Sequence, residues 1–294
     1  MNNSETTLVQ NTNTSLPSTS SSANSSKEMG ILDHLEELRW HVIRAVLAIL
    51  VFTAVAFIAK DIVFGKIILG PSKSNFLTYQ FFCQLSSLTC IDNLPFIIQN
   101  RVMTGQFTMH IAASIAFGFM CAFPYVFWEI WRFVAPALYN EERNVARGAT
   151  FFVSLLFAIG VLFGYFLITP LSINFLSNYQ VDATILNEID ISSYVTTVAM
   201  LTLGCGLMFQ LPIVVFFLSQ VGIVTPELMR AYRKHSIVVI LFISALITPP
   251  DVISQCLIGI PIWILYEISI LISASIQKKR NIAIAKAEKL RQME

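Results

Sequence analysis

The sequence predicts an all-α polytopic membrane protein with six transmembrane helices, a fold class that three observations indicate. First, 55% of the residues are hydrophobic and only 13% are charged, whereas a soluble domain carries roughly a quarter charged residues. Second, apolar runs long enough to cross about 30 Å of hydrocarbon recur along the chain. Third, Lys and Arg gather in alternate connecting segments, as they do on the inner side of a membrane.

The order of these runs predicts the domain organisation. Residues 1–29 are rich in Ser, Thr and Asn and lack the apolar core of a secretory signal peptide, so we expect a disordered tail there. Residues 30–275 are expected to form the membrane domain, and residues 276–294 a basic tail. The predicted spans cover about residues 41–59, 108–131, 149–169, 194–220, 236–248 and 252–274.

The fifth and sixth spans are expected to be short. The apolar run at 236–247 would cover only about 18 Å as a helix. The Thr-Pro-Pro-Asp sequence at 248–251 then predicts a tight turn into the last span. A core helix of a soluble domain is the alternative interpretation of 236–247, because length alone does not exclude it.

The basic residues predict the orientation of the chain. If the N-terminus is inside, the inner segments hold 15 of the 19 Lys and Arg residues. The outer segments hold only Lys60, Lys66, Lys73 and Arg101. Both termini are therefore expected to face the cytoplasm.

Residues 29–45, MGILDHLEELRWHVIRA, precede the first span and carry acidic residues close to the membrane. Leucines at helical spacing and a capping-box pattern at Asp33 and Glu36 predict an amphipathic helix. We expect it to lie along the inner interface before the chain turns into the membrane. Glu36, Glu37 and Arg39 would lie on its polar side. Local ion pairs on a solvated face are the alternative interpretation.

Residues 132–148, RFVAPALYNEERNVARG, place two carboxylates at the start of the third span. Pro136 ends an apolar aromatic segment, and Glu141 and Glu142 follow. The helix dipole alone favours carboxylates at such a position. Alternatively, they receive a guanidinium group, with which a carboxylate forms planar bidentate bonds. Together with residues 36–37, they could receive a pair of neighbouring arginines.

Polar residues inside the predicted spans are few, and each is costly to bury. Glu129, Gln210 and Glu267 lie in spans, and Asp251 ends the outer turn. No two acids lie four residues apart within one span, so hydrogen bonding within the bundle or to a partner helix is favoured over a proton relay. Cys83 and Cys90 share the first outer loop, where a disulfide and two free thiols are equally consistent with the sequence.

The sequence contains no metal-ligand spacing, phosphate loop or protease motif. An enzyme, a cofactor and a nucleic-acid partner are therefore not expected. A small-molecule or ion transporter is the competing function, but it predicts internal repeats and paired acids at the midplane. Neither is visible between the two halves of the chain.

Four motifs resemble the TatC family, the multispanning subunit of the twin-arginine protein translocase. They occur in family order over about residues 30–275, and the long first outer loop is similar to the Bacteroidota variant. The motifs are HLEELR at 34–39, FVAPALYNEER at 133–143, ITPPDVISQ at 247–255 and IPIWILYEISI at 260–270.

This resemblance implies a receptor in the bacterial inner membrane that binds twin-arginine signal peptides of folded proteins at the cytoplasmic face. It also implies TatA/TatB-type single-span partners, further TatC copies and export driven by the protonmotive force. The implied signal-peptide residues are Glu37, Arg39, Phe133, Pro136, Tyr139, Glu142 and Arg143. Gln210, Asp251 and Glu267 match other signature positions, expected to hold a partner helix or the structure itself.

The chain departs from the family pattern at two positions. His41 stands where many members have an arginine, so a fixed positive charge is in doubt there, although Arg44 could compensate. Gln210 stands where many members have a glutamate. Because Gln does not ionise, an obligatory proton carrier is not expected at that position.

Overall fold

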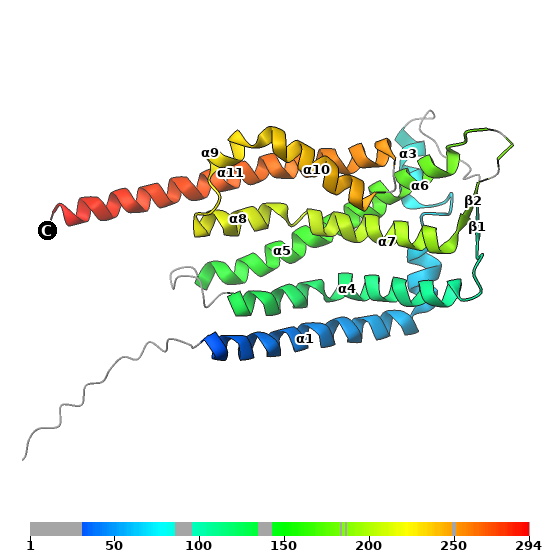
Figure 1. The fold of residues 1–294 in the computed structure, drawn as a ribbon, viewed down its shortest axis with the longest axis horizontal. Coiled ribbons are helices and arrows are strands. Elements are labelled where there is room, and N and C mark those ends of the chain that lie inside the picture. Colours follow the sequence, from blue (N-terminus) through cyan, green and yellow to red (C-terminus); the bar gives the residue numbers. More distant parts are fainter. Residues whose placement is uncertain are drawn as a thin grey trace, which may run out of the picture.

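The computed structural model describes residues 31–85, 96–134, 143–182, 184–185, 187–248 and 251–293, with backbone only at 31–35, 85, 134, 143–149, 253 and 287. Within these ranges the long helices run side by side along the longest axis of the molecule (Figure 1). They are α1 (Ile31–Ile58), α4 (Gly105–Val134), α5 (Arg143–Phe163), α7 (Ile191–Met208), α8 (Leu211–Val221), α10 (Arg233–Ile247) and α11 (Val252–Arg291).

Five helical segments in the described part of the chain are long and apolar enough to cross a membrane: Glu36–Ile58, Gly105–Phe133, Thr150–Asn178, Ile191–Val221 and Ser254–Arg291. The third runs on from α5 through a π-helical turn (Gly164–Ile168) into α6 (Thr169–Asn178). The fourth joins α7 and α8, and the short α9 (Pro226–Ala231) follows it. The predicted fifth span falls on α10, whose 15 residues fall short of a full span.

Two predicted helix boundaries were wrong. No separate interface helix precedes the first span, because α1 is continuous from Ile31 and contains no Pro or Gly to break it. Asp33 therefore lies within α1 rather than at its N-cap. At the other end of the chain, α11 continues from the predicted end of the last span to Arg291. Its Ala-, Lys- and Glu-rich residues are good helix formers, and this part projects beyond the bundle (Figure 1).

The helices pack in a chain of neighbours. α1 lies along α4, α4 contacts α5 and α7, α5 contacts α7, and α11 contacts α8 and α10. Gly118 allows α4 to approach α1 closely, since a Cβ there would lie 2.6 Å from the backbone nitrogen of Thr53. Gly160 does the same between α5 and α7, where a Cβ would lie 2.8 Å from the Cys205 carbonyl oxygen.

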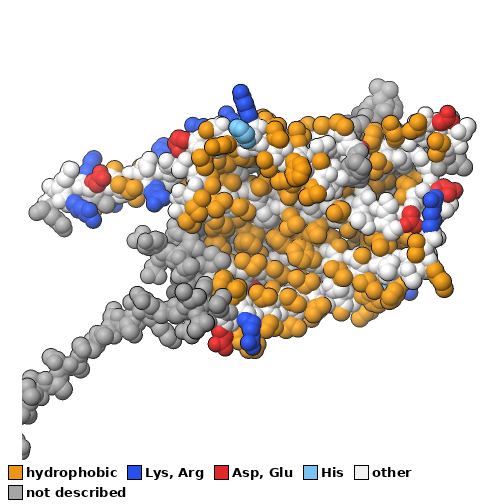
Figure 2. Space-filling model, viewed as in Figure 1, with side chains coloured by type: hydrophobic (Ala, Val, Ile, Leu, Met, Phe, Trp, Pro, Cys, Tyr) orange, Lys and Arg blue, Asp and Glu red, His pale blue; other side chains and the backbone are white. Residues whose placement is uncertain are grey.

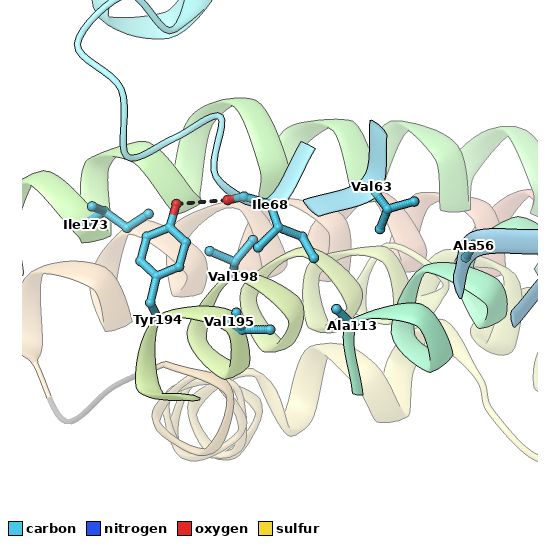
Figure 3. Close-up of a cluster of buried hydrophobic side chains, with 8 residues drawn as sticks. All are labelled: Ala56, Val63, Ile68, Ala113, Ile173, Tyr194, Val195 and Val198. Carbon is cyan, nitrogen blue, oxygen red and sulfur yellow. Dashed lines mark hydrogen bonds between the residues drawn. The ribbon is translucent and has the colours of Figure 1, made fainter. Parts of the chain in front are cut away.

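A buried cluster joins α1, α4, α6 and α7 near one end of the bundle (Figure 3). Tyr194 of α7 donates a hydrogen bond of 2.9 Å to the carbonyl oxygen of Ile68, in the π-helical turn Val63–Ile68 that follows α2 (Lys60–Ile62). This bond ties the first loop to the helices. The cluster consists of Ala56, Val63, Ile68, Ala113, Ile173, Tyr194, Val195 and Val198.

We call this end of the bundle the strand end: α3 (Leu77–Leu85), β1 (Ile97–Gln99) and β2 (Glu188–Asp190). β1 and β2 pair in parallel, with Ile97 opposite Glu188. Tyr79 of α3 donates to the carbonyl oxygens of Pro71 at 2.9 Å and Pro170 at 3.1 Å, and burial raises the pKa of its hydroxyl. The loop that holds Pro71 is thus joined through α3 to the start of α6.

The cysteines divide between the loop and the spans. Cys83 of α3 is disulfide-bonded, while Cys90 lies outside the described residues. Cys121, Cys205 and Cys256 are free thiols.

Hydrophobic side chains cover the middle of the bundle, and charged side chains lie toward its ends (Figure 2). Leu50 of α1, Phe152 of α5 and Phe242 of α10 are among the exposed apolar residues. An exposed apolar surface of this extent is typical of contact with lipid. The protein is therefore a multipass membrane protein.

Candidate functional site

The end opposite the strand end brings two of the predicted motifs together. We call it the motif end: Glu36–Arg44 of α1 and Tyr125–Phe133 of α4. Glu37 and His41 are four residues apart and lie on one face of α1, and Glu129 and Phe133 have the same relation on α4. Because α1 packs along α4, these two faces can meet.

A buried carboxylate links the two helices. His41 Nδ1 lies 2.5 Å from Glu129 Oε2, and the two residues are only 7% and 1% exposed. The Tyr125 hydroxyl donates to the other oxygen, Oε1, at 3.0 Å. Arg44 Nη1 of α1 lies 4.0 Å from Oε2. Donors from both helices thus surround one carboxylate, as burial of a charge requires.

Three of the predicted signal-peptide residues, Phe133, Glu37 and Arg39, lie at the motif end. Phe133 is half-buried, and its ring centroid lies 6.3 Å from that of His41. Glu37 is half-buried, while Glu36 is exposed. Arg39 is also exposed, with its guanidinium carbon 5.8 Å from the centroid of the Trp40 ring. The motif end therefore presents carboxylates and an aromatic ring, a combination able to accept a guanidinium group.

Part of the predicted site lies outside this description. Pro136, Tyr139, Glu141 and Glu142 lie outside the described residues. α5 begins at Arg143, for which only the backbone is described. The structure thus brings Glu37, Arg39 and Phe133 to one end, and the rest of the set stays a prediction.

The other three predicted polar residues lie away from the motif end. Gln210 lies between α7 and α8 and donates to the Val153 carbonyl of α5 at 3.2 Å. Its buried Oε1 has no partner among the described residues. Asp251 caps α11 by accepting from the Ser254 amide at 2.6 Å, and Glu267 of α11 pairs with Arg233 of α10 at 2.7 Å. All three therefore have a structural partner, and Gln210 also has an oxygen that is left without one in the described part of the chain.

The His41–Glu129 pair was missed by sequence reasoning. His41 was noted only as a departure from the family pattern, and Glu129 only as an isolated polar residue. Eighty-eight residues separate them in sequence, so no local spacing signals the contact. Among the described residues, no group of three or more His, Cys, Asp or Glu could hold a metal ion.

Comparisons with known proteins identify the family. The TatC family profile, described as Sec-independent protein translocase protein (TatC), matches residues 33–261. A TatC of Blattabacterium sp. subsp. Periplaneta americana is 36% identical over 87% of this chain and 99% of its own length. A TatC of Halalkalibacterium halodurans is 32% identical over 91% of this chain and 96% of its own length.

A crystal structure of the twin-arginine translocase receptor TatC has the same fold. It superimposes with a TM-score of 0.69 at 31% identity, covering 83% of this chain and 99% of that one. TatC proteins are membrane components of a translocase rather than catalytic enzymes. This chain belongs to the TatC family, the Sec-independent, twin-arginine translocase subunit.

Proposed function

We propose that this protein is the core receptor subunit of the translocase. It binds twin-arginine signal peptides of folded precursors at the cytoplasmic face. With TatA/TatB-type single-span partners and other TatC copies, it passes the precursors across the bacterial inner membrane, driven by the protonmotive force.

The observation that carries this proposal is the arrangement of the motif end. Glu37 and Phe133 come from helices far apart in sequence, yet each lies one turn from the same His41–Glu129 contact. A carboxylate on one helix and an aromatic ring on the other suit a guanidinium, which forms bidentate bonds with the first and stacks on the second. Lysine offers neither geometry. Glu142, Pro136, Tyr139 and Arg143 would complete the site from the segment after α4.

The topology that we propose places both termini in the cytoplasm, with 30–275 as the membrane domain. α10 would be the fifth of six spans, and its short length would draw the bilayer inward locally. The basic end of α11 would remain in the cytoplasm. The buried Oε1 of Gln210 is an acceptor that a partner helix could engage.

The test measures the affinity of a twin-arginine signal peptide and its twin-lysine version for the purified protein. Wild type should bind the arginine peptide about tenfold or more tightly, the difference expected when bidentate charge-assisted bonds are lost. Glu142→Ala and Glu37→Ala should each reduce that preference. Ser273→Ala, which removes a buried hydrogen bond between α8 and α11, is the control. Equal affinity of wild type for both peptides would reject the receptor proposal.

A further inference from the structure

We propose that His41 and Glu129 form a positioning pair that holds the two halves of the signal-peptide site at a fixed separation. The halves are Glu37 on α1 and Phe133 on α4. The inference rests on the proposed function, because it assigns a role to residues directly beneath that site. The pair itself does not touch the peptide, since both of its side chains are buried.

Helical geometry places the His41–Glu129 pair one turn beneath Glu37 and Phe133. A helix turns once in 3.6 residues and rises about 5.4 Å per turn. Glu37 therefore lies about one turn from His41 on the same face, and Phe133 about one turn from Glu129. The His41–Glu129 bond thus sets how α1 and α4 meet one turn below the site. A slide or rotation of α1 at this contact would move Glu37 away from Phe133.

The second argument is the directionality of the contact. Each oxygen of Glu129 has its own hydrogen-bonding partner, His41 on one and Tyr125 on the other. Charge-assisted bonds of this kind are short and fix geometry more strictly than apolar packing does. Glu129 is only 1% exposed, so loss of His41 would leave Oε2 of a buried carboxylate without its hydrogen-bonding partner. The helices would then have to rearrange.

The third argument is electrostatic. α1 carries three basic or potentially basic side chains close to Glu37, namely Arg39, His41 and Arg44. Glu129 pairs with His41 and lies 4.0 Å from Arg44. Since Glu129 accepts from His41 and offsets the charge of Arg44, Glu37 remains an acceptor for the arginines of an arriving peptide. The pair therefore serves both the shape and the charge of the site.

The test is a double-mutant cycle in which two quantities are measured for each variant. One is the melting temperature. The other is a ratio, the Kd of the twin-lysine peptide divided by the Kd of the twin-arginine peptide. His41→Ala and Glu129→Ala should each lower this ratio about tenfold, and the double variant should be no worse than either, because coupled residues act as a unit. His41→Arg, which offers another nitrogen donor to the Glu129 carboxylate, should retain the ratio within about threefold. Ser273→Ala should lower the melting temperature without changing the ratio.

The possible outcomes distinguish a positioning role of the pair from a purely structural one. Should the single variants melt earlier yet keep the wild-type ratio, the pair is only structural and the inference falls while the receptor proposal stands. The inference would also be overturned if the double variant lost the ratio by the product of the two single losses, because the residues would then act independently. A loss of the ratio in His41→Arg as large as that in His41→Ala would overturn it too. If wild type itself shows no preference, the receptor proposal fails, and the inference fails with it. Where Glu129→Ala does not fold, Glu129→Gln removes the charge at nearly constant volume.

Discussion

The two ends of the bundle are held together by different kinds of contact. At the motif end, α1 and α4 are joined through side chains that converge on one buried carboxylate, Glu129. At the strand end, the long-range bonds end mostly on backbone atoms, as when Tyr79 donates to the carbonyls of Pro71 and Pro170. Backbone acceptors are present whatever the side chain, so the strand end shapes the loops. The motif end depends on particular residues, as a recognition site does.

We therefore expect substitutions at the strand end to lower the free energy of unfolding and to leave peptide binding unchanged. Tyr79→Ala should show the largest effect, a loss of about 3–5 kcal/mol in the free energy of unfolding, because it removes a fully buried aromatic side chain. Tyr79→Phe keeps the ring and should lose only about 1 kcal/mol. Denaturant unfolding in detergent measures both. A loss of twin-arginine preference in the folded Tyr79→Phe variant would remove the distinction between the ends.

Gly118 lies between the two ends and should affect both properties. Gly118→Val places a side chain against the backbone of Thr53, which should cost about 1–3 kcal/mol and move α1 away from α4. Both the melting temperature and the twin-arginine preference should therefore fall. Gly65→Ala is the matched control, since a Cβ there meets no atom within 4 Å. Normal peptide preference in Gly118→Val would show that α1–α4 spacing does not control the site.

The strand end should also respond to acid. The Ser192 hydroxyl and the backbone amides of Arg101, Ser192 and Ile191 donate to Asp190 and hold the pKa of its carboxyl below its usual value. The folded pKa is therefore lower than the unfolded one, about 3.9. The stabilisation is present above the unfolded pKa and is lost as the pH falls through the folded pKa. Melting temperatures below about pH 4 should fall less steeply in Asp190→Asn than in wild type; equal slopes would contradict this.

The smallest effect is expected at the exposed ion pair of the strand end. Arg101 Nη2 lies 3.2 Å from Glu188 Oε2, with side chains 57% and 40% exposed. Pairs of this kind contribute about 0–1 kcal/mol. Arg101→Ala should therefore shift the free energy of unfolding by less than about 1 kcal/mol, and a double-mutant cycle with Glu188→Ala gives the coupling. A larger coupling would mean that charged side chains also hold the strand end.

Hydropathy predicted where the long apolar helices lie, because lipid imposes a simple rule of length and apolarity. Hydropathy and charge predicted neither the continuous α1 nor the long α11, since a membrane boundary does not by itself end a helix. No Pro or Gly stands in α1, and none stands in α11 after Pro261. Hydropathy and charge also missed the β1–β2 pair. Each of its strands has three residues, and their pairing joins segments about ninety positions apart.

The sequence predicted that two motifs act together at one site, but it did not predict which of their residues lie in contact. HLEELR and FVAPALYNEER indicated Glu37, Arg39 and Phe133 because each motif is local. The contact between His41 and Glu129 depends on how α1 packs along α4, which no spacing within either helix encodes. In the sequence alone, His41 is a position where the chain departs from an arginine of the family pattern. In the structure, His41 is the hydrogen-bonding partner of the buried Glu129.

The proposed receptor site is tested most directly by mapping where a bound signal peptide touches the chain. A twin-arginine peptide with a photoreactive residue beside its arginine pair would be cross-linked to the wild-type protein in membranes, and the adducts mapped by mass spectrometry. We predict adducts at the motif end, around residues 36–39 and 133–143, which a twin-lysine peptide does not give. Adducts concentrated at the strand end, or equal yields from both peptides, would contradict the account.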